Sequence, residues 1–323
     1  MAARAVPARS AGSRDVPPHL EANLSQSQSR GSRAVAGCPA SGLRYNEPMR
    51  LPLAAVRPSR LAHGMRRVAV LFPAALLIGL WLYGTPGGLL GKADAIGYAV
   101  CHRIDLRSFH LGARPLPLCS RCTGMYLGAV LAFAYFALRG RGRAGAFPSW
   151  PLLVVLGVFG LAFAVDGLNS YLHFFPEAPN LYPPSNTLRL ITGTGIGLAL
   201  GTLVYPGFNQ SAWRDWRLEP VLRSFPDLAA LLALAAVLVL AVLSDNPLIL
   251  YPLALISSLG VLLLLTLIYT MLVLMALRRE NRATSWRDLA LPLTGGLTLA
   301  VSQIALIDLG RFLLTGTWSG FSL

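Results

Sequence analysis

Apolar segments long enough to cross a lipid bilayer recur along this chain of 323 residues. A helix needs about 20 apolar residues to span the hydrocarbon, with roughly 17 as the lower bound. Most of the segments also lack the polar face that a surface helix of a soluble protein would carry. The sequence therefore predicts an all-α, polytopic helical membrane protein with about seven transmembrane helices, six being the alternative count. The predicted spans are residues 68–84, 123–139, 150–168, 188–205, 227–244, 248–277 and 291–309.

Composition and charge agree with a lipid bilayer as the main partner. Hydrophobic residues make up 54% of the chain and charged residues 13%, whereas a soluble domain carries about 25% charged residues. The net charge of +14 would fit nucleic-acid binding. The basic residues, however, stand in the N-terminal region and in short loops between apolar segments, which is the pattern of membrane topology. We expect no nucleic acid as a partner; an anionic lipid surface fits the charge.

The sequence divides into three regions. Residues 1–64 are rich in Ala, Arg, Ser and Pro, a composition that predicts a disordered tail because it offers little to bury. Two alternatives would explain this region: translation begins at Met65 or Met49, or the region is an Arg-rich targeting peptide that is removed. Residues 65–205 form a membrane domain that contains a loop at 85–122. Residues 206–323 add further transmembrane helices.

The loop charges predict an orientation. Arginines precede the first span and cluster at 139–143, 214–223 and 278–287, whereas the loops at 169–187 and 245–247 contain no Lys or Arg. Because basic loops stay inside, the N-terminus is predicted to be cytoplasmic. The loop at 85–122 would then be extracytoplasmic although it holds Lys92 and four arginines. We interpret those arginines as part of a site; a reversed first third of the topology is the alternative.

Three of the four cysteines fall in this loop, at Cys101, Cys119 and Cys122. Three thiols cannot all pair among themselves as disulfides, so a metal site, a redox pair or a catalytic thiol is favoured. The two-residue spacing of Cys119 and Cys122 lets both thiolates reach one tetrahedral ion. Cys101 with His102 or His110 would complete a Cys3His set for zinc or another transition metal. His110 is the more favourable fourth ligand, because adjacent Cys101 and His102 would strain the backbone.

Two other interpretations of the thiols stay open. Cys119 and Cys122 stand at the predicted start of a helix beside Arg121, where the pKa of a thiol is lowered and thiol–disulfide exchange is favoured. Alternatively, one structural disulfide closes the loop and the histidines and arginines lie at the lipid headgroups.

A family resemblance rests on these same residues. Cys-His-Arg at 101–103, Arg-Ser-Phe at 107–109 and Pro-Leu-Cys-Ser-Arg-Cys-Thr-Gly-Met-Tyr-Leu-Gly at 117–128 resemble the signature of a prokaryotic family of predicted membrane proteins, domain of unknown function 2085. The resemblance continues through Asp-Gly-Leu-Asn at 166–169 and Asn-Thr-Leu-Arg-Leu-Ile-Thr-Gly at 186–193, and covers about residues 90–205. It implies a prokaryotic plasma-membrane protein and supplies no activity.

Polar groups at the membrane edge are the further site candidates. Charges within spans are costly and are usually paired or functional, so Asp166 and Arg189 are expected to pair with each other. Together with Arg121 they are the candidate catalytic residues. Arg103, Arg107, Arg121 and Arg189 together could clamp a lipid phosphate or a small anion, because guanidinium groups suit bidentate recognition of phosphate and carboxylate.

Glycines at 193, 197 and 201 and at 124 and 128 recur every fourth residue on the fourth and second spans. This spacing predicts close packing of helix backbones.

These observations favour a membrane protein with a metal-binding Cys/His loop next to an Asp/Arg cluster. A membrane thiol–disulfide oxidoreductase, an enzyme acting on a lipid phosphate, and a small-solute or ion transporter with Asp166 and Arg189 on its path are the alternatives. The sequence contains no Walker loop, dinucleotide-binding glycine pattern, His-Glu-x-x-His or Gly-x-Ser-x-Gly motif.

Overall fold

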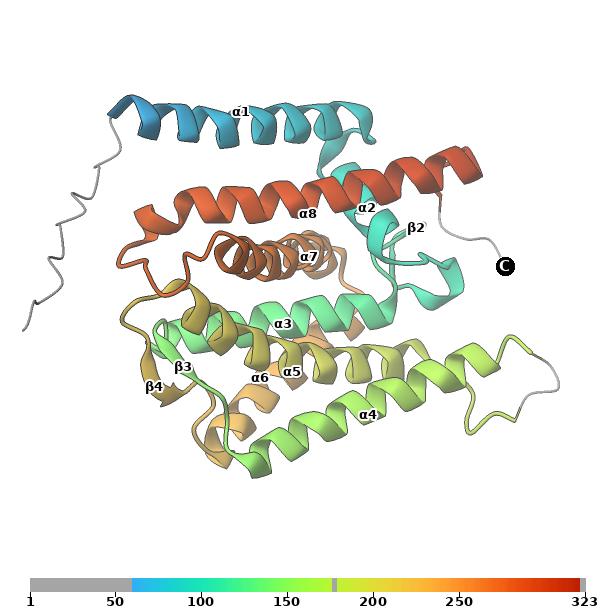
Figure 1. The fold of residues 1–323 in the computed structure, drawn as a ribbon. Coiled ribbons are helices and arrows are strands. Elements are labelled where there is room, and N and C mark those ends of the chain that lie inside the picture. Colours follow the sequence, from blue (N-terminus) through green and yellow to red (C-terminus); the bar gives the residue numbers. More distant parts are fainter. Residues whose placement is uncertain (1–59, 176–178, 320–323) are drawn as a thin grey trace, which may run out of the picture. The chain divides into compact units, whose positions relative to one another are not determined.

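The computed structural model describes residues 60–175 and 179–319. Residues 1–59 of the expected disordered tail lie outside the described residues. The described part contains eight α-helices and four short strands (Figure 1). The helices are α1 (Arg60–Gly84), α2 (Gly88–Val100), α3 (Ser120–Leu138), α4 (Trp150–Leu172), α5 (Asn186–Ala212), α6 (Phe225–Leu243), α7 (Pro247–Ala276) and α8 (Trp286–Thr315). The strands are β1 (His110–Leu111), β2 (Arg114–Pro115), β3 (Ala144–Ala146) and β4 (Arg217–Pro220), and a 3-10 turn, η1, covers Asp105–Arg107.

Polar caps define where several of these apolar helices begin. The side chain of Ser185 accepts the N–H of Leu188 (3.2 Å) at the start of α5. Asn246 accepts the N–H of Leu248 (3.0 Å) at the start of α7, which continues with a proline. Such caps satisfy backbone donors that the first turn leaves open, and proline is compatible with the first helical positions. The capping residues Ser185 and Asn246 therefore specify where the apolar helices α5 and α7 begin.

The number of membrane spans agrees with the sequence prediction. Helices α3, α4, α5, α6, α7 and α8 are each long and apolar enough to cross a bilayer. A seventh candidate combines Val68–Gly84 of α1 with α2, and these two segments meet at an angle of 105°. The protein is thus a helical membrane protein with six candidate spans among the described residues, or seven if the bent pair counts as one.

Helix α2 differs from the sequence prediction, which treats residues 85–122 as one loop. Its 13 residues are too few to cross the hydrocarbon, and apolar helices of this length are usually re-entrant or buried. Tyr98 is 0% exposed and Ala95 is equally buried. The carbonyl of Pro117 lies so close to Gly97 that a Cβ there would overlap it. Helix α2 therefore anchors the first part of the loop against its last part.

The predicted glycine contacts are confirmed between α3 and α5. A Cβ on Gly193 would overlap the carbonyl oxygen of Arg121, and one on Gly197 would overlap the carbonyl oxygen of Met125. From the first contact to the second, the position advances by four residues on α3 and by four residues on α5, so the two helices run parallel. Close backbone contact of this kind is what small residues permit in membrane proteins. It fixes the start of α3 against the first turns of α5.

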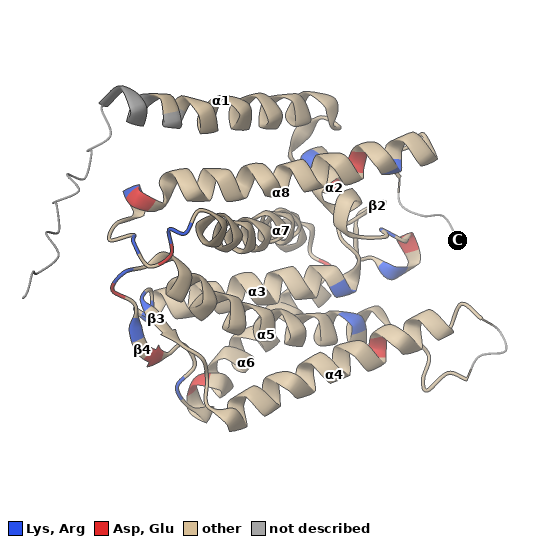
Figure 2. Cartoon of the chain, in the orientation of Figure 1, with Lys and Arg blue, Asp and Glu red and all other residues tan. Residues whose placement is uncertain are grey.

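Charged residues gather at the two ends of the helices, and uncharged stretches lie between them (Figure 2). At one end, β3 pairs in parallel with β4, and buried Arg141 forms an ion pair with Asp227 (2.8 Å). At the opposite end lie the starts of α3 and α5, the end of α4 and the 101–119 segment. This second end contains all the candidate site residues.

Candidate metal centre and arginine cluster

Three cysteines meet at the start of α3. Cys101 follows the last residue of α2, Cys119 immediately precedes α3, and Cys122 lies in its first turn. Their three sulfur atoms all lie within 4.8 Å of one another. Cys101 and Cys119 are 6% and 3% exposed, and Cys122 is half-buried. All three are free thiols, so the expected convergence of these cysteines holds in the structure.

The sulfur of Cys101 is at the centre of the group. The backbone N–H groups of Cys119 (3.3 Å) and Arg103 (3.4 Å) donate to it. The pKa of the Cys101 thiol is well below its usual range, because the thiols of Cys119 and Cys122 and these N–H groups all stabilise the thiolate. The pKa of Cys119 is raised, because its thiol donates to Cys101. The three sulfurs thus share a negative charge that is available to a cation.

Helix α8 holds this centre in place. The guanidinium of Arg311 donates to the carbonyls of Tyr98 (2.6 Å) and Cys101 (2.8 Å). It also stacks over the Tyr98 ring, 4.0 Å from its centroid. Arg311, about 200 residues later in the chain, therefore satisfies the buried carbonyls of the turn that carries Cys101. The sequence places Arg311 among the polar groups at the outer end of the last predicted span, and no local pattern connects it to Cys101.

Neither histidine joins the sulfur atoms among the described residues. The ring of His110 is hydrogen-bonded through Nε2 to Asp105 (3.0 Å), at the surface of the loop. The Nδ1 atom of His102 accepts the N–H of Ile104 (3.0 Å). The pKa of His102 is lowered, first by burial and also by the nearby arginines, so its neutral form is favoured. Of the five predicted ligands, the structure brings together the three thiols.

A buried carboxylate and an arginine lie beside the thiols. Asp166 of α4 is 1% exposed and forms an ion pair with Arg121 of α3; the Nε of Arg121 is 3.1 Å from its Oδ2. Tyr182 donates to the same carboxylate (3.2 Å), and the hydroxyl of Thr192 lies 3.4 Å from it. The expected pairing of Asp166 with Arg189 is thus wrong, because the close packing of α3 on α5 places Arg121 nearer. Tyr182, which the sequence analysis did not include, is a further member of the cluster.

Arg107 and Arg189 complete an arginine cluster with Arg121. Ser170 connects two of its members: Arg107 donates to its carbonyl (3.0 Å) and Arg121 to its hydroxyl (2.9 Å). Arg189 is 6% exposed and donates to Asn186 (2.9 Å), while its buried Nε has no hydrogen-bond partner within the described structure. The pKa of Arg107 is lowered by burial and by the charges of Arg189 and Arg121. These three residues are called the arginine cluster below.

The fourth arginine of the predicted clamp is directed elsewhere. Arg103 pairs with Asp94 of α2 (2.9 Å) and donates to the carbonyl of Trp318 (3.1 Å). Arg114 also pairs with Asp94. These contacts fold the loop onto α2 and the end of the described chain. Arg103 therefore has a structural partner of its own, and the arginine cluster consists of three guanidinium groups, of which Arg121 pairs with Asp166.

Comparisons with known proteins coincide with this part of the chain. The family described as "Predicted membrane protein (DUF2085)" matches residues 101–203. An uncharacterized protein of Methanothermobacter thermautotrophicus is 36% identical over 107 residues, which cover 32% of this chain and 86% of the relative. An uncharacterized protein of Methanocaldococcus jannaschii is 24% identical over 124 residues, covering 38% of this chain and 72% of the relative. No solved structure matches the chain.

The matched segment begins at Cys101 and includes both remaining thiols of the centre, Asp166 and the whole arginine cluster. Helices α6, α7 and α8 follow it. The archaeal relatives are covered over most of their own length by the same segment. The chain belongs to the DUF2085 family of predicted membrane proteins.

Proposed function

We propose that Cys101, Cys119 and Cys122 bind one transition-metal ion, zinc in the first instance. The observation that carries this proposal is the mutual approach of the three sulfur atoms to within 4.8 Å. A zinc–sulfur bond of about 2.3 Å in a tetrahedron separates the sulfurs by about 3.8 Å. Small side-chain rotations therefore suffice to close the ligand set around an ion.

The surroundings of the thiols favour the charge that such a site would carry. Three thiolates around a divalent cation leave one negative charge, and the cationic arginine cluster lies within electrostatic range of Cys119. Two backbone N–H groups already donate to the sulfur of Cys101. Hydrogen bonds of this kind orient ligands and tune the metal in known sites.

The fourth coordination position is proposed to belong to water or to a ligand from outside the chain. His110 is engaged with Asp105, and the Nδ1 of His102 accepts a backbone N–H. Three protein ligands and one open position are characteristic of catalytic zinc, whereas structural zinc has four. A metal bound here would supply Lewis-acid chemistry, and this chain's own residues would orient an anionic group through the arginine cluster.

The arginine cluster supports an anionic ligand, a lipid phosphate or a small anion. Arg121 pairs with Asp166, and Arg107 and Arg189 have no carboxylate partner within the described residues, so the cluster carries two excess positive charges. Arginine is suited to phosphate and carboxylate oxygens because of its planar set of donors. The positive-inside pattern of the other loops leads us to propose that this end of the helices is extracytoplasmic.

Metal analysis of purified protein tests the proposed centre. Wild-type protein, purified from cells grown with zinc and without added chelator, is expected to contain about one zinc per chain. Cys101→Ser and Cys119→Ser should each lower this content at least tenfold, as expected when one ligand of such a site is lost. Cys38→Ser removes the remaining cysteine and serves as the matched control, with unchanged metal content.

Peptide mapping under non-reducing conditions distinguishes the redox alternative. A Cys119–Cys122 or Cys101–Cys119 disulfide in metal-free wild-type protein, isolated with an alkylating agent present from lysis, would overturn the metal proposal in favour of thiol–disulfide exchange. Free thiols together with less than a tenth of an equivalent of any transition metal would also overturn it.

A further inference from the structure

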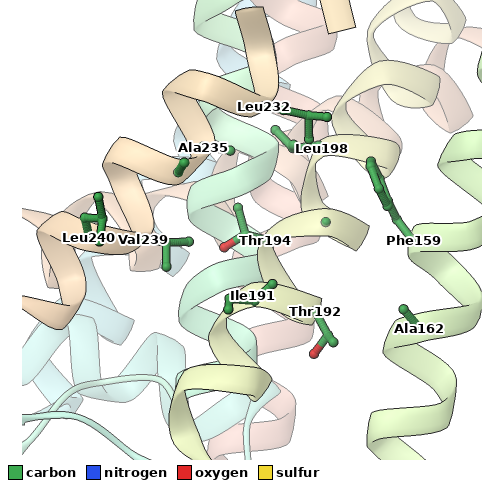
Figure 3. A pocket seen from close by; sticks show the side chains of 12 residues that line it. Phe159, Ala162, Ile191, Thr192, Thr194, Leu198, Leu232, Ala235, Val239 and Leu240 are labelled. Carbon is green, nitrogen blue, oxygen red and sulfur yellow. The ribbon is translucent and has the colours of Figure 1, made fainter. Parts of the chain in front are cut away.

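An apolar cavity of about 460 Å³ lies between α4, α5 and α6, close to the arginine cluster. Phe159 and Ala162 of α4, Ile191 and Thr192 of α5, and Leu232 and Leu240 of α6 are among its lining residues (Figure 3). Ile191, Leu232 and Leu240 are 49%, 38% and 66% exposed. Because the three helices are candidate membrane spans, these side chains face lipid in the bilayer.

The wall of this cavity offers no free hydrogen-bonding group. Its two polar side chains are Thr192 and Thr194. The hydroxyl of Thr194 donates to the carbonyl of Leu190 (2.8 Å), and that of Thr192 donates to the carbonyl of Leu188 (2.9 Å). The cavity therefore suits a hydrocarbon chain and not a polar solute.

One end of the cavity leads to the arginine cluster. Thr192 lines the cavity, and its hydroxyl oxygen also lies 3.4 Å from Oδ2 of Asp166. Ala162 and Asp166 are about one helical turn apart on α4, or about 6 Å along its axis, and Thr192 and Arg189 are just under one turn apart on α5, or about 4.5 Å. The apolar wall of the cavity thus lies about one helical turn from the arginine cluster and its two excess positive charges.

The cluster also has donor capacity left for a ligand. The Nε of Arg189 is buried without a hydrogen-bond partner in the described part of the chain. Arg107 and Arg121 are only half-buried, and Arg107 contributes to the cluster from the 101–119 segment. Leaving a buried charged donor unsatisfied is costly, so an additional acceptor at this position would stabilise the folded protein.

We propose that this cavity and the arginine cluster together bind one anionic phospholipid, with an acyl chain along α5 and α6 and the phosphate at Arg107 and Arg189. The proposal rests on the anionic ligand proposed above and commits to a lipid as its source. A free anion would use the charged end alone and would leave the apolar cavity without a role. A neutral lipid would use the cavity and leave the two excess positive charges of the arginine cluster uncompensated. An anionic phospholipid has both an acyl chain for the cavity and a phosphate for the arginine cluster, so it fits both parts of the site.

Native mass spectrometry of the full chain in detergent, titrated with phosphatidylglycerol or phosphatidylcholine of identical acyl chains, tests this. The wild type should retain phosphatidylglycerol about tenfold more tightly, because a charge-assisted hydrogen bond contributes about one such factor. Arg107→Gln and Arg189→Gln should each reduce that preference to about twofold. Arg114→Gln, a change of equal charge in the same loop at a residue paired with Asp94, should leave the preference intact.

The cavity is tested by filling it. Ala236 lines the cavity, whereas Ala233 is exposed on the same helix and is not among the lining residues. Ala236→Phe should weaken retention of phosphatidylglycerol at least fivefold, by removing apolar contact of the kind that stabilises an acyl chain; Ala233→Phe should not. Both variants should elute as folded monodisperse protein.

Three results would overturn the proposal. The first is equal retention of the two lipids by the wild type, and the second is an unchanged preference in both Arg107→Gln and Arg189→Gln. In the third, glycerol phosphate at millimolar concentration displaces the lipid completely and Ala236→Phe has no effect. This last result would leave the anionic ligand standing and exclude a lipid as its source. The metal content of the same samples shows separately whether the thiolate centre is intact.

Discussion

Replacement of Asp166 by asparagine should destabilise the protein more than any other single charge removal at this end of the helices. The carboxylate is 1% exposed. It accepts hydrogen bonds from Arg121 (Nε, 3.1 Å) and Tyr182 (3.2 Å). Asparagine preserves the shape, removes the charge and turns an amide N–H toward the guanidinium. Arg121 would then be a half-buried cation among the cationic side chains of its neighbours.

The expected cost follows from the burial of the pair. Removing one partner of a buried ion pair costs about 3–5 kcal/mol. We expect about 3 kcal/mol for Asp166→Asn, because the amide oxygen retains part of the acceptor capacity. For a domain of this size, 1 kcal/mol corresponds to about 2–4 °C in Tm. The predicted loss in Tm is therefore about 6–12 °C.

Thermal unfolding of purified protein in one detergent, followed by light scattering and intrinsic fluorescence, measures this loss. Glu219→Gln is the matched control, because Glu219 pairs with Arg223 (2.7 Å) at a site where both side chains are about half exposed. An exposed pair contributes less than about 1 kcal/mol. The double variant Arg121→Gln/Asp166→Asn should cost less than the sum of the two single variants. A Tm for Asp166→Asn equal to that of Glu219→Gln would refute the assigned role of this ion pair.

Three further predictions concern packing, orientation and support of the thiolate centre. Gly197→Ala should destabilise the protein by about 1–3 kcal/mol, because the new methyl group overlaps the carbonyl of Met125, whereas Gly157→Ala, in open space, should not; equal Tm values would contradict the close α3–α5 contact. An alkaline phosphatase reporter should be inactive when fused at position 214 and active at position 245 if the basic loops are cytoplasmic, and the reverse activities would invert the proposed orientation. Arg311→Met should lower zinc affinity about 10–100-fold, measured against a chelator of known affinity, because it releases the carbonyl of Cys101; unchanged affinity would show that this contact does not support the centre.

The membrane architecture could be predicted from the sequence because its physical cause is local. Apolar runs of span length and the basic loops between them are visible without any tertiary information, and six of the predicted spans coincide with helices of the structure. The bend between α1 and α2 was not visible. Residues 88–100 form a helix that is too short to cross the bilayer and contains Lys92 and Asp94, and its burial depends on tertiary contacts with Pro117 and Ser258.

The composition of the site could be predicted only in part. The spacing of Cys119 and Cys122 on the first turn of a helix fixes their proximity, and Cys101 joins them as expected. The prediction of His102 and His110 as ligands rests on their residue type and on their closeness in sequence to the cysteines. Neither property reveals that His110 is hydrogen-bonded to Asp105. The glycine pattern does contain a signal for Arg121. If the span with Gly124 and Gly128 packs in parallel against the span with Gly193 and Gly197, Arg121 lies beside the first turns of the fourth predicted span.

X-ray absorption at the zinc edge of the purified full-length protein tests the central claim most directly. We predict three sulfur scatterers at about 2.3 Å and one nitrogen or oxygen scatterer at about 2.0 Å. Cys119→Ser protein should lose this spectrum, and Cys38→Ser protein should keep it. A first shell made only of nitrogen and oxygen, or wild-type protein that binds no zinc while its thiols are reduced, would contradict a metal–thiolate centre at the start of α3.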